Sequence, residues 1–197
     1  MEIDLSKLTP DVRNLDDMRE VLFDQEFAKN TENVGLYSMY RGIEENNGIR
    51  YDITIVPART LGQEFVKTKG HYHIGKYGEV YTVLEGQAIY LMQRKVTASE
   101  IAHVYAVKAK KGDVVVIPSN YGHITINPSE TEDLKMANWV ASECKSDYSD
   151  FEKLQGGCYY YTKNGWVKND HYRIVPELKF EGTLKEVPKD LEFLKVN

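Results

Sequence analysis

Apolar and polar positions alternate over short stretches along most of the chain, and Gly, Asn and Pro interrupt them. After Asn33 these stretches are rich in β-branched and aromatic residues, which favours strands. Glu85-Gly86-Gln87 and residues 110–113 read as tight turns. So many short strands at near-regular spacing are typical of an antiparallel sandwich or barrel. We predict strands over 35–41, 50–57, 64–68, 79–85, 87–95, 102–108, 113–117, 123–126 and 135–141, with a shorter pair at 157–162 and 165–168.

The segment before these strands has a helical pattern instead. Leu15, Met18, Leu22 and Phe27 form a spaced apolar face, and Asn14 is suited to cap its start. We therefore predict one long helix, packed on the outside of a mainly β domain. The single domain divides into a helical segment (1–33), a barrel that carries the site (34–175) and a charged C-terminal tail along the surface (176–197).

Composition narrows the class of protein. A chain of 197 residues suits one domain, and its net charge of -5 disfavours nonspecific binding to nucleic acid or anionic lipid. Two cysteines, Cys144 and Cys158, are too few for the disulfide framework of a secreted chain of this size. The start, Met1-Glu2-Ile3-Asp4, lacks the basic and apolar run of a signal peptide, and no stretch reaches the roughly 20 apolar residues of a membrane span. We expect a soluble cytoplasmic protein with no nucleic-acid or membrane partner.

Histidine and glutamate side chains carry the strongest chemical signal. His71 and His73 are two residues apart, so on a strand both imidazoles project from one face. Glu79 follows a turn-like segment at the head of the next strand, where Tyr81 shares its face, and His123 follows a later turn. Neutral imidazoles with one carboxylate suit Fe²⁺, Mn²⁺, Ni²⁺ or Zn²⁺. Such a set leaves one or two coordination positions for the oxygens of a substrate.

The spacing around these residues adds a second signal. Glu79 is followed after six residues by Gly86, and a later run reads Gly112, Pro118, His123 and Asn127 at intervals of six, five and four. Together these resemble the two signature motifs of the cupin family, a double-stranded β-helix or jelly-roll barrel that binds a metal. Asn120 stands where the second motif usually has Gly, a substitution that a left-handed turn tolerates.

A longer match narrows the family. Residues 64–73 read EFVKTKGHYH, and Glu79-Val80-Tyr81 follows. Residues 37–148 thus resemble the cupin-type glucose-6-phosphate isomerases of archaea and some bacteria. The resemblance implies reversible conversion of glucose 6-phosphate to fructose 6-phosphate, a step of glycolysis and gluconeogenesis. It also implies a homodimer with one divalent metal per subunit, for which Fe²⁺ is the preferred candidate. It implies metal ligands at His71, His73, Glu79 and His123, and substrate contacts at Tyr37, Thr54, Thr68 and Gly70.

A metal held by histidines and one carboxylate fits the reaction of an aldose–ketose isomerase. A sugar carbonyl and its neighbouring hydroxyl chelate one metal, which stabilises a cis-enediolate. Glu79 is the candidate base that moves the proton between C1 and C2, and a hydride shift is the open alternative. Tyr81 is expected beside Glu79, and the resemblance places Tyr148 against the sugar.

Other interpretations remain open. The family's His just before the Asp147-Tyr148 pair is replaced by Lys145-Ser146, so proton transfer or ring opening by that His has no counterpart. An open iron site also suits a cupin Fe(II) oxidoreductase, such as a dioxygenase, and a third reading is a noncatalytic sugar-phosphate-binding cupin. Read without the resemblance, Thr54 and Thr68 are ordinary strand residues, and Lys67 and Lys69 are solvated edge charges. His103 and His171 are expected to be structural or surface residues.

Overall fold

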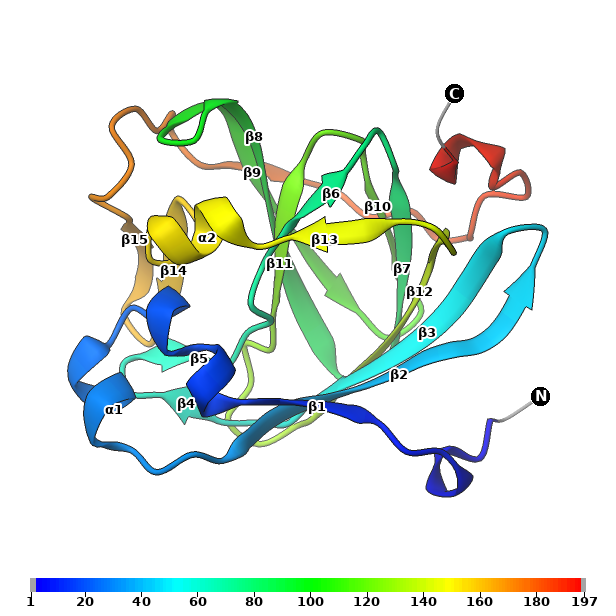
Figure 1. Ribbon diagram of the computed structural model, residues 1–197, viewed down its shortest axis with the longest axis horizontal. Helices are drawn as coiled ribbons and strands as arrows, with labels where there is room; N and C mark the ends of the chain where they lie inside the picture. Colours follow the sequence, from blue (N-terminus) through cyan, green and yellow to red (C-terminus); the bar gives the residue numbers. More distant parts are fainter. Residues whose placement is uncertain (1–2, 196–197) are drawn as a thin grey trace.

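The fold of the computed structural model, which describes residues 3–195, is dominated by β-strands (Figure 1). Residues 1, 2, 196 and 197, at the outer ends of the predicted first and third segments, lie outside the described residues. The strands are β1 Asp11–Asn14, β2 Gly35–Asn46, β3 Ile49–Val56, β4 Thr60–Leu61, β5 Glu64–Phe65, β6 Tyr72–Ile74, β7 Glu79–Glu85, β8 Gln87–Thr97, β9 Glu100–Lys110, β10 Val114–Ile117, β11 Gly122–Ile126, β12 Leu134–Ala141, β13 Lys145–Asp147, β14 Tyr159–Thr162, β15 Gly165–Lys168 and β16 Lys179–Glu181. The helices are α1 Gln25–Asn30 and α2 Ser149–Lys153, with 3₁₀ turns η1 Leu5–Lys7, η2 Leu15–Asp17, η3 Arg19–Val21 and η4 Glu192–Leu194.

Two main sheets form the body of the molecule. One has the strand order β1-β2-β3-β12-β7-β10 and the other β11-β8-β9-β16, and the largest hydrophobic cluster draws on both. A short β6–β13 pair continues the second sheet, because His71 bridges to His123 beside it. The predicted mainly β jelly-roll architecture is therefore confirmed. Within residues 3–195 the sheets remain separate and do not close into one hydrogen-bonded barrel.

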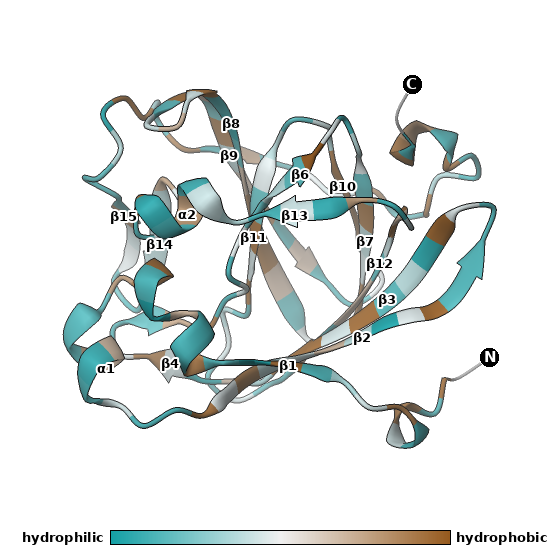
Figure 2. Ribbon diagram, in the orientation of Figure 1, coloured by the Kyte–Doolittle hydropathy of each residue, from teal (hydrophilic) through white to brown (hydrophobic). Residues whose placement is uncertain are grey.

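Strand β7 shows how side-chain alternation builds this body. Tyr81 and Val83 point into the main core, whereas Val80 belongs to a second cluster on the other face of the sheet. Figure 2 shows apolar and polar bands changing along β2 and β3 in the same way. The strand bounds of β7 match the predicted 79–85, since this segment has both the strand pattern and clear turns at its ends.

The predicted long helix is wrong. Its apolar face exists, because Leu15, Met18 and Leu22 are completely buried, but the backbone forms the turns η2 and η3 and the short helix α1. The Asn14 amide donates to the Asp17 carboxylate at 2.9 Å, which closes a first turn. Leu22 is extended, and the Asp24 side chain then accepts from the Phe27 amide and caps a new helix. Two competing caps within ten residues divide the segment.

The terminal segments join the sheets. Strand β1 pairs with β2, and β16 pairs in parallel with β9, so the tail adds a strand where the sequence indicated only a surface path. Leu194 in the tail is completely buried. Asn120 has a φ of 67°, which confirms the left-handed turn expected there. No helix in the described range, 3–195, has the length and apolar character needed to cross a lipid bilayer.

Candidate metal and substrate site

A pocket of about 670 Å³, partly continuous with solvent, lies between the two sheets. Every site residue that the sequence predicted lines it: Tyr37, Thr54, Thr68, Gly70, His71, His73, Glu79, Tyr81, His123 and Tyr148. The large sheet contributes through β2, β3 and β7, while His123 lies on β11, His73 on β6, and His71 in the segment just before β6. Residues up to 111 positions apart in sequence, Tyr37 and Tyr148, are thus brought to one cavity.

Four of these side chains form a compact cluster. One ligand atom each from His71, His73, Glu79 and His123 lies within 4.8 Å of the others. Glu79 Oε2 is 3.3 Å from His73 Nε2 and 3.2 Å from His123 Nε2. The backbones of His71 and His123 exchange two hydrogen bonds, of 3.3 and 3.0 Å, which fix the two histidines side by side. The imidazoles of His71 and His73 lie on one face, as their spacing predicted.

The polar atoms of this cluster fit a divalent cation. Glu79 Oε2 is buried and has no hydrogen-bond partner in the described part of the chain, whereas Oε1 accepts from Asn138 at 2.6 Å. His73 Nδ1 lies 3.0 Å from the Tyr77 carbonyl oxygen, so we assign the Nδ1 proton to that contact and the free lone pair to Nε2. A buried carboxylate oxygen facing two imidazole nitrogens is a donor set for Fe²⁺, Mn²⁺, Ni²⁺ or Zn²⁺.

The charge states of the cluster follow from burial and mutual contact. Burial lowers the pKa of His71 well below its ordinary value and also lowers the pKa of His123. Burial alone would raise the pKa of Glu79, but His123 and His73 outweigh it and the pKa lies below its ordinary value. For His73, burial acts downward, yet Cys144 and Glu79 raise the pKa to about 10. A metal ligand at His73 must be the neutral imidazole, so metal binding there would compete with protons.

Asn138 is a polar residue of the site that sequence reasoning missed. It lies on β12, directly opposite Tyr81 of β7, and its side chain is buried against Glu79. The only signal available in the sequence is a polar residue within an apolar strand. Its contact with Glu79 depends on the register between strands far apart in the chain.

We expect Asn138→Ala to weaken metal binding by roughly 10- to 100-fold, because the amide that orients the ligand carboxylate is removed. Competition with a chromophoric chelator measures this affinity. Ser142→Ala in the same strand–turn region, outside the pocket lining, is the control and should bind metal like the wild type. An unchanged affinity in Asn138→Ala would show that Glu79 is oriented without Asn138.

The predicted substrate contacts lie beside the cluster. The Tyr37 hydroxyl accepts from the Lys69 amide at 3.1 Å. The Thr68 hydroxyl oxygen accepts from the Thr125 amide at 2.9 Å, so its own proton is free for another acceptor. Gly70 has a φ of +80°, and an added Cβ would lie 2.6 Å from Ile124 and 2.8 Å from Phe151. The fold thus requires glycine at position 70 independently of any ligand.

Gly70→Ala should lower the free energy of unfolding by roughly 2 kcal/mol or more, from left-handed strain and overpacking. Urea denaturation measures it. Gly182→Ala is the control, because an added Cβ there meets no atom within 4 Å and φ is not in the left-handed region. Equal stability of the two variants would contradict the expected clash.

Two of the expectations about charged residues need correction. Lys67 and Lys69 are not solvated edge charges: Lys67 is 3% exposed and pairs with Glu64, and Lys69 Nζ lies 2.5 Å from Glu152. The pattern missed these partners because one of them, Glu152, comes from a distant helix. Lys145 is exposed, whereas Ser146, just before the Asp147-Tyr148 pair, lines the pocket.

The two remaining histidines agree with their expectation. His103 Nδ1 lies 3.0 Å from the Tyr121 hydroxyl, and His171 is exposed. Neither residue lines the pocket.

Comparison with known proteins identifies the family. The model of the glucose-6-phosphate isomerase (GPI) family matches residues 12–177, most of the chain. The chain belongs to the glucose-6-phosphate isomerase family. The resemblance seen in the sequence is confirmed, and the match extends beyond residues 37–148 at both ends.

Individual members of the glucose-6-phosphate isomerase family match this chain at modest sequence identity. The glucose-6-phosphate isomerase of Pyrococcus abyssi is 27% identical over 164 residues, which cover 80% of this chain and 83% of the relative. The Thermococcus gammatolerans enzyme is 31% identical over 59% of this chain and 61% of its own. Among solved structures, oxalate oxidase in complex with glycolate matches with a TM-score of 0.45, 13% identity, and coverage of 57% of this chain and 54% of that chain. Tomato (Solanum lycopersicum) vicilin matches with a TM-score of 0.43, 13% identity, and coverage of 57% and 31%.

Proposed function

We propose that this protein is a metal-dependent isomerase that interconverts glucose 6-phosphate and fructose 6-phosphate, a step of glycolysis and gluconeogenesis. The observation that carries the proposal is that one pocket holds both a three-histidine, one-carboxylate cluster and the Thr68–Gly70 segment. The cluster could hold a metal that binds the carbonyl and neighbouring hydroxyl of a sugar, and the Thr68–Gly70 segment offers hydrogen-bond donors for a phosphate. Membership of the glucose-6-phosphate isomerase family supports the substrate.

His71, His73, Glu79 and His123 would hold one divalent metal, for which we propose Fe²⁺ first, with Mn²⁺, Ni²⁺ or Zn²⁺ as alternatives. When bound, the metal acts as a Lewis acid toward the sugar carbonyl and the neighbouring hydroxyl. The fit rests on the buried, unpartnered Oε2 of Glu79 and the two imidazole nitrogens that face it.

The protein's own groups position the sugar and move the proton. Glu79 is the one carboxylate of the cluster, and it would take a proton at one of the two reacting carbons and return it at the other. The Tyr81 hydroxyl lies 3.5 Å from His123 Nε2, where it would contact an oxygen of the sugar. The Tyr148 ring, 5.6 Å from the His71 ring, would pack against the open-chain sugar. Tyr37, Thr54, Thr68 and Gly70 would hold the phosphate.

We further propose a homodimer that acts in the cytoplasm. Among residues 3–195, the outer strand β1 of the large sheet pairs on one side only, and an unpaired strand edge is suited to burial against a second subunit. Light scattering coupled to size exclusion should give twice the chain mass of 22.7 kDa. A mass of one chain would contradict the dimer and leave the isomerase proposal intact.

A coupled assay that forms glucose 6-phosphate from fructose 6-phosphate tests the activity. Chelator-stripped protein should be inactive, and Fe²⁺, Mn²⁺, Ni²⁺ and Zn²⁺, added back separately, should restore turnover to different extents. Oxygen uptake is recorded in parallel, because an Fe(II) oxidoreductase consumes O₂ and an isomerase does not. Tight binding of fructose 6-phosphate without turnover by any metal form would favour the noncatalytic sugar-phosphate-binding cupin.

A further inference from the structure

The wall of the pocket formed by β2 and β3 carries two arginines that the predicted site does not use. Tyr37 and Arg41 lie four residues apart on β2, and Thr54 and Arg50 four apart on β3. Residues at even spacing share one face of a strand, and all of these line the pocket. Four residues of strand span about 13 Å. Arg41 therefore lies about 13 Å along β2 from Tyr37, and Arg50 about 13 Å along β3 from Thr54.

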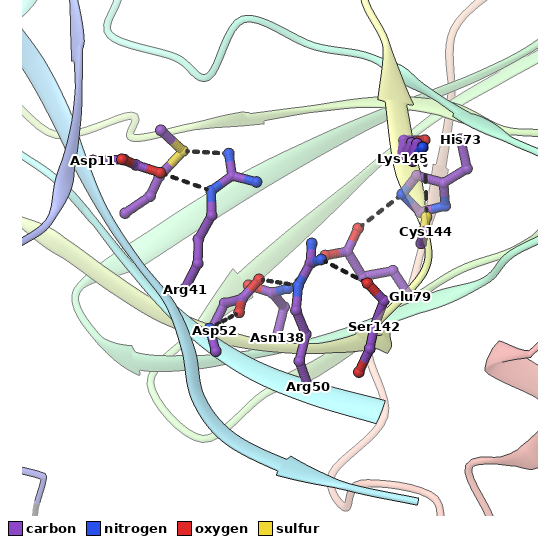
Figure 3. Close-up of polar contacts among 12 residues, drawn as sticks. Asp11, Arg41, Arg50, Asp52, His73, Glu79, Asn138, Ser142, Cys144 and Lys145 are labelled. Atoms are coloured by element: carbon purple, nitrogen blue, oxygen red, sulfur yellow. Dashed lines mark hydrogen bonds and ion pairs between the residues drawn. The ribbon is translucent and has the colours of Figure 1, made fainter. Parts of the chain in front are cut away.

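The part of this wall that carries Arg50 lies beside the metal cluster. Across the sheet, Arg50 pairs with Val140 and Val140 pairs with Glu79, so the three form one row. Two strand spacings place the Arg50 and Glu79 backbones about 10 Å apart. Arg41 lines the same cavity as His71, His73 and Glu79. Figure 3 shows both arginine side chains on the face of the sheet that carries Glu79.

Arg50 is held rigidly with part of its guanidinium unused. Its Nε donates to Asp52 Oδ2 at 3.0 Å and its Nη1 to the Ser142 carbonyl at 3.4 Å. Asp52 is fixed in turn, because its other oxygen accepts from the Gly42 amide at 2.7 Å. A guanidinium has five N–H groups, so three remain in a pre-oriented fork. Such a fork matches the oxygens of a phosphate or carboxylate.

Arg41 is held weakly. Its Nε lies 3.5 Å from Asp11 Oδ2, and the two side chains are 40% and 72% exposed. Its Nη2 donates to the sulfur of Met39 at 3.3 Å. Exposed ion pairs of this kind contribute about 0–1 kcal/mol, so a ligand anion competes readily for Arg41.

We propose that Arg41 and Arg50 form a second anion-binding subsite, at the end of the pocket beyond C1 of the sugar. The orientation rests on the proposed function, which places the 6-phosphate near Tyr37 and Thr54 and the reacting carbons at the metal ligands. The subsite then takes sugar phosphates that carry a second anionic group on the C1 oxygen. A ketohexose 1,6-bisphosphate is of this class, and it binds as a competitive inhibitor that spans both subsites.

Calorimetric titration of the metal-loaded holoenzyme with fructose 1,6-bisphosphate and with fructose 6-phosphate tests the subsite. The bisphosphate should bind at least about tenfold more tightly, since a charge-assisted contact contributes about 1.4 kcal/mol or more. Arg41→Gln should reduce this preference by about tenfold. Arg94→Gln is the matched control, because Arg94 is exposed on β8 and absent from the pocket lining. It should keep the full preference.

Arg50 is tested as Arg50→Lys, which keeps the charge and loses the fork, and as Arg50→Gln with Asp52→Asn, which removes the pair together. Both should lower the preference for the bisphosphate. Equal affinities for the two sugars in the wild type, or a preference retained in the Arg41 and Arg50 variants, would overturn the subsite. A fall in kcat without a change in the preference would also overturn it, by assigning the arginines to the reaction. Absence of turnover in the wild type contradicts the isomerase instead, and the two affinities still report on the subsite.

Discussion

Glu79→Gln should lower metal-restored isomerase turnover by at least about 1000-fold, because several kcal/mol of charge stabilisation and the proton-transfer base are lost together. The glutamine oxygen can still accept from Asn138, as Oε1 does now at 2.6 Å. Its NH₂ group then takes the place of Oε2 and points donors at His73 and His123, where a metal ligand needs a lone pair. The coupled assay measures turnover, and elemental analysis measures the bound metal in the same sample.

Glu85→Gln is the matched control for Glu79→Gln. Glu85 ends the same strand, and its side chain is 61% exposed beside Lys135, so the charge change is equal and the site is untouched. We expect wild-type turnover from it. A Glu79→Gln protein with full metal content and substantial turnover would exclude Glu79 as the base and favour a hydride shift.

The predictable features of this structure are those that depend on short stretches of sequence. Alternation over residues 79–85 predicted β7 and the shared face of Glu79 and Tyr81. The two-residue spacing of His71 and His73 predicted two imidazoles on one side. The spacing around His123 then added the fourth ligand through a family motif.

The contacts that were not predictable depend on register between distant strands. Asn138 reaches Glu79 because β12 pairs with β7, 59 positions apart in sequence. The Arg50–Asp52 pair faces the pocket because β12 also pairs with β3 on its other side. Side-chain period alone does not give register, so these residues read as ordinary strand positions.

Local signals also fail where two of them compete. The helical face of Leu15, Met18 and Leu22 is buried as expected, yet the side chains of Asp17 and Asp24 close separate turns. Short polar side chains that bond to nearby backbone amides offer an alternative to a continuous helix. The apolar pattern therefore predicted which of these residues are buried. The polar side chains determine where the backbone turns.

Lys67→Met should lower the free energy of unfolding by about 3–5 kcal/mol, the usual cost of leaving a buried charge unpaired. Its partner Glu64 is 0% exposed and Lys67 is 3% exposed, and their side chains are hydrogen-bonded. Glu64 also accepts from the Phe23 amide at 2.6 Å, which ties the N-terminal turns to the segment before the metal ligands. Burial raises the pKa of Glu64 against the effect of Lys67, so removal of Lys67 favours the protonated acid. Urea denaturation of the metal-free protein measures the change apart from metal binding.

A double-mutant cycle separates the pair from the packing around it. Glu64→Gln keeps an acceptor for Phe23 and removes the charge, so Glu64→Gln with Lys67→Met should cost less than the sum of the two single changes. Lys135→Met is the control, since its pair with Glu85 spans 3.4 Å with side chains 24% and 61% exposed. An exposed pair contributes about 0–1 kcal/mol, and this variant should change stability by no more. If Lys67→Met and Lys135→Met cost the same, the buried pair does not anchor the N-terminal turns, and backbone hydrogen bonds such as those to β11 hold the segment before His71.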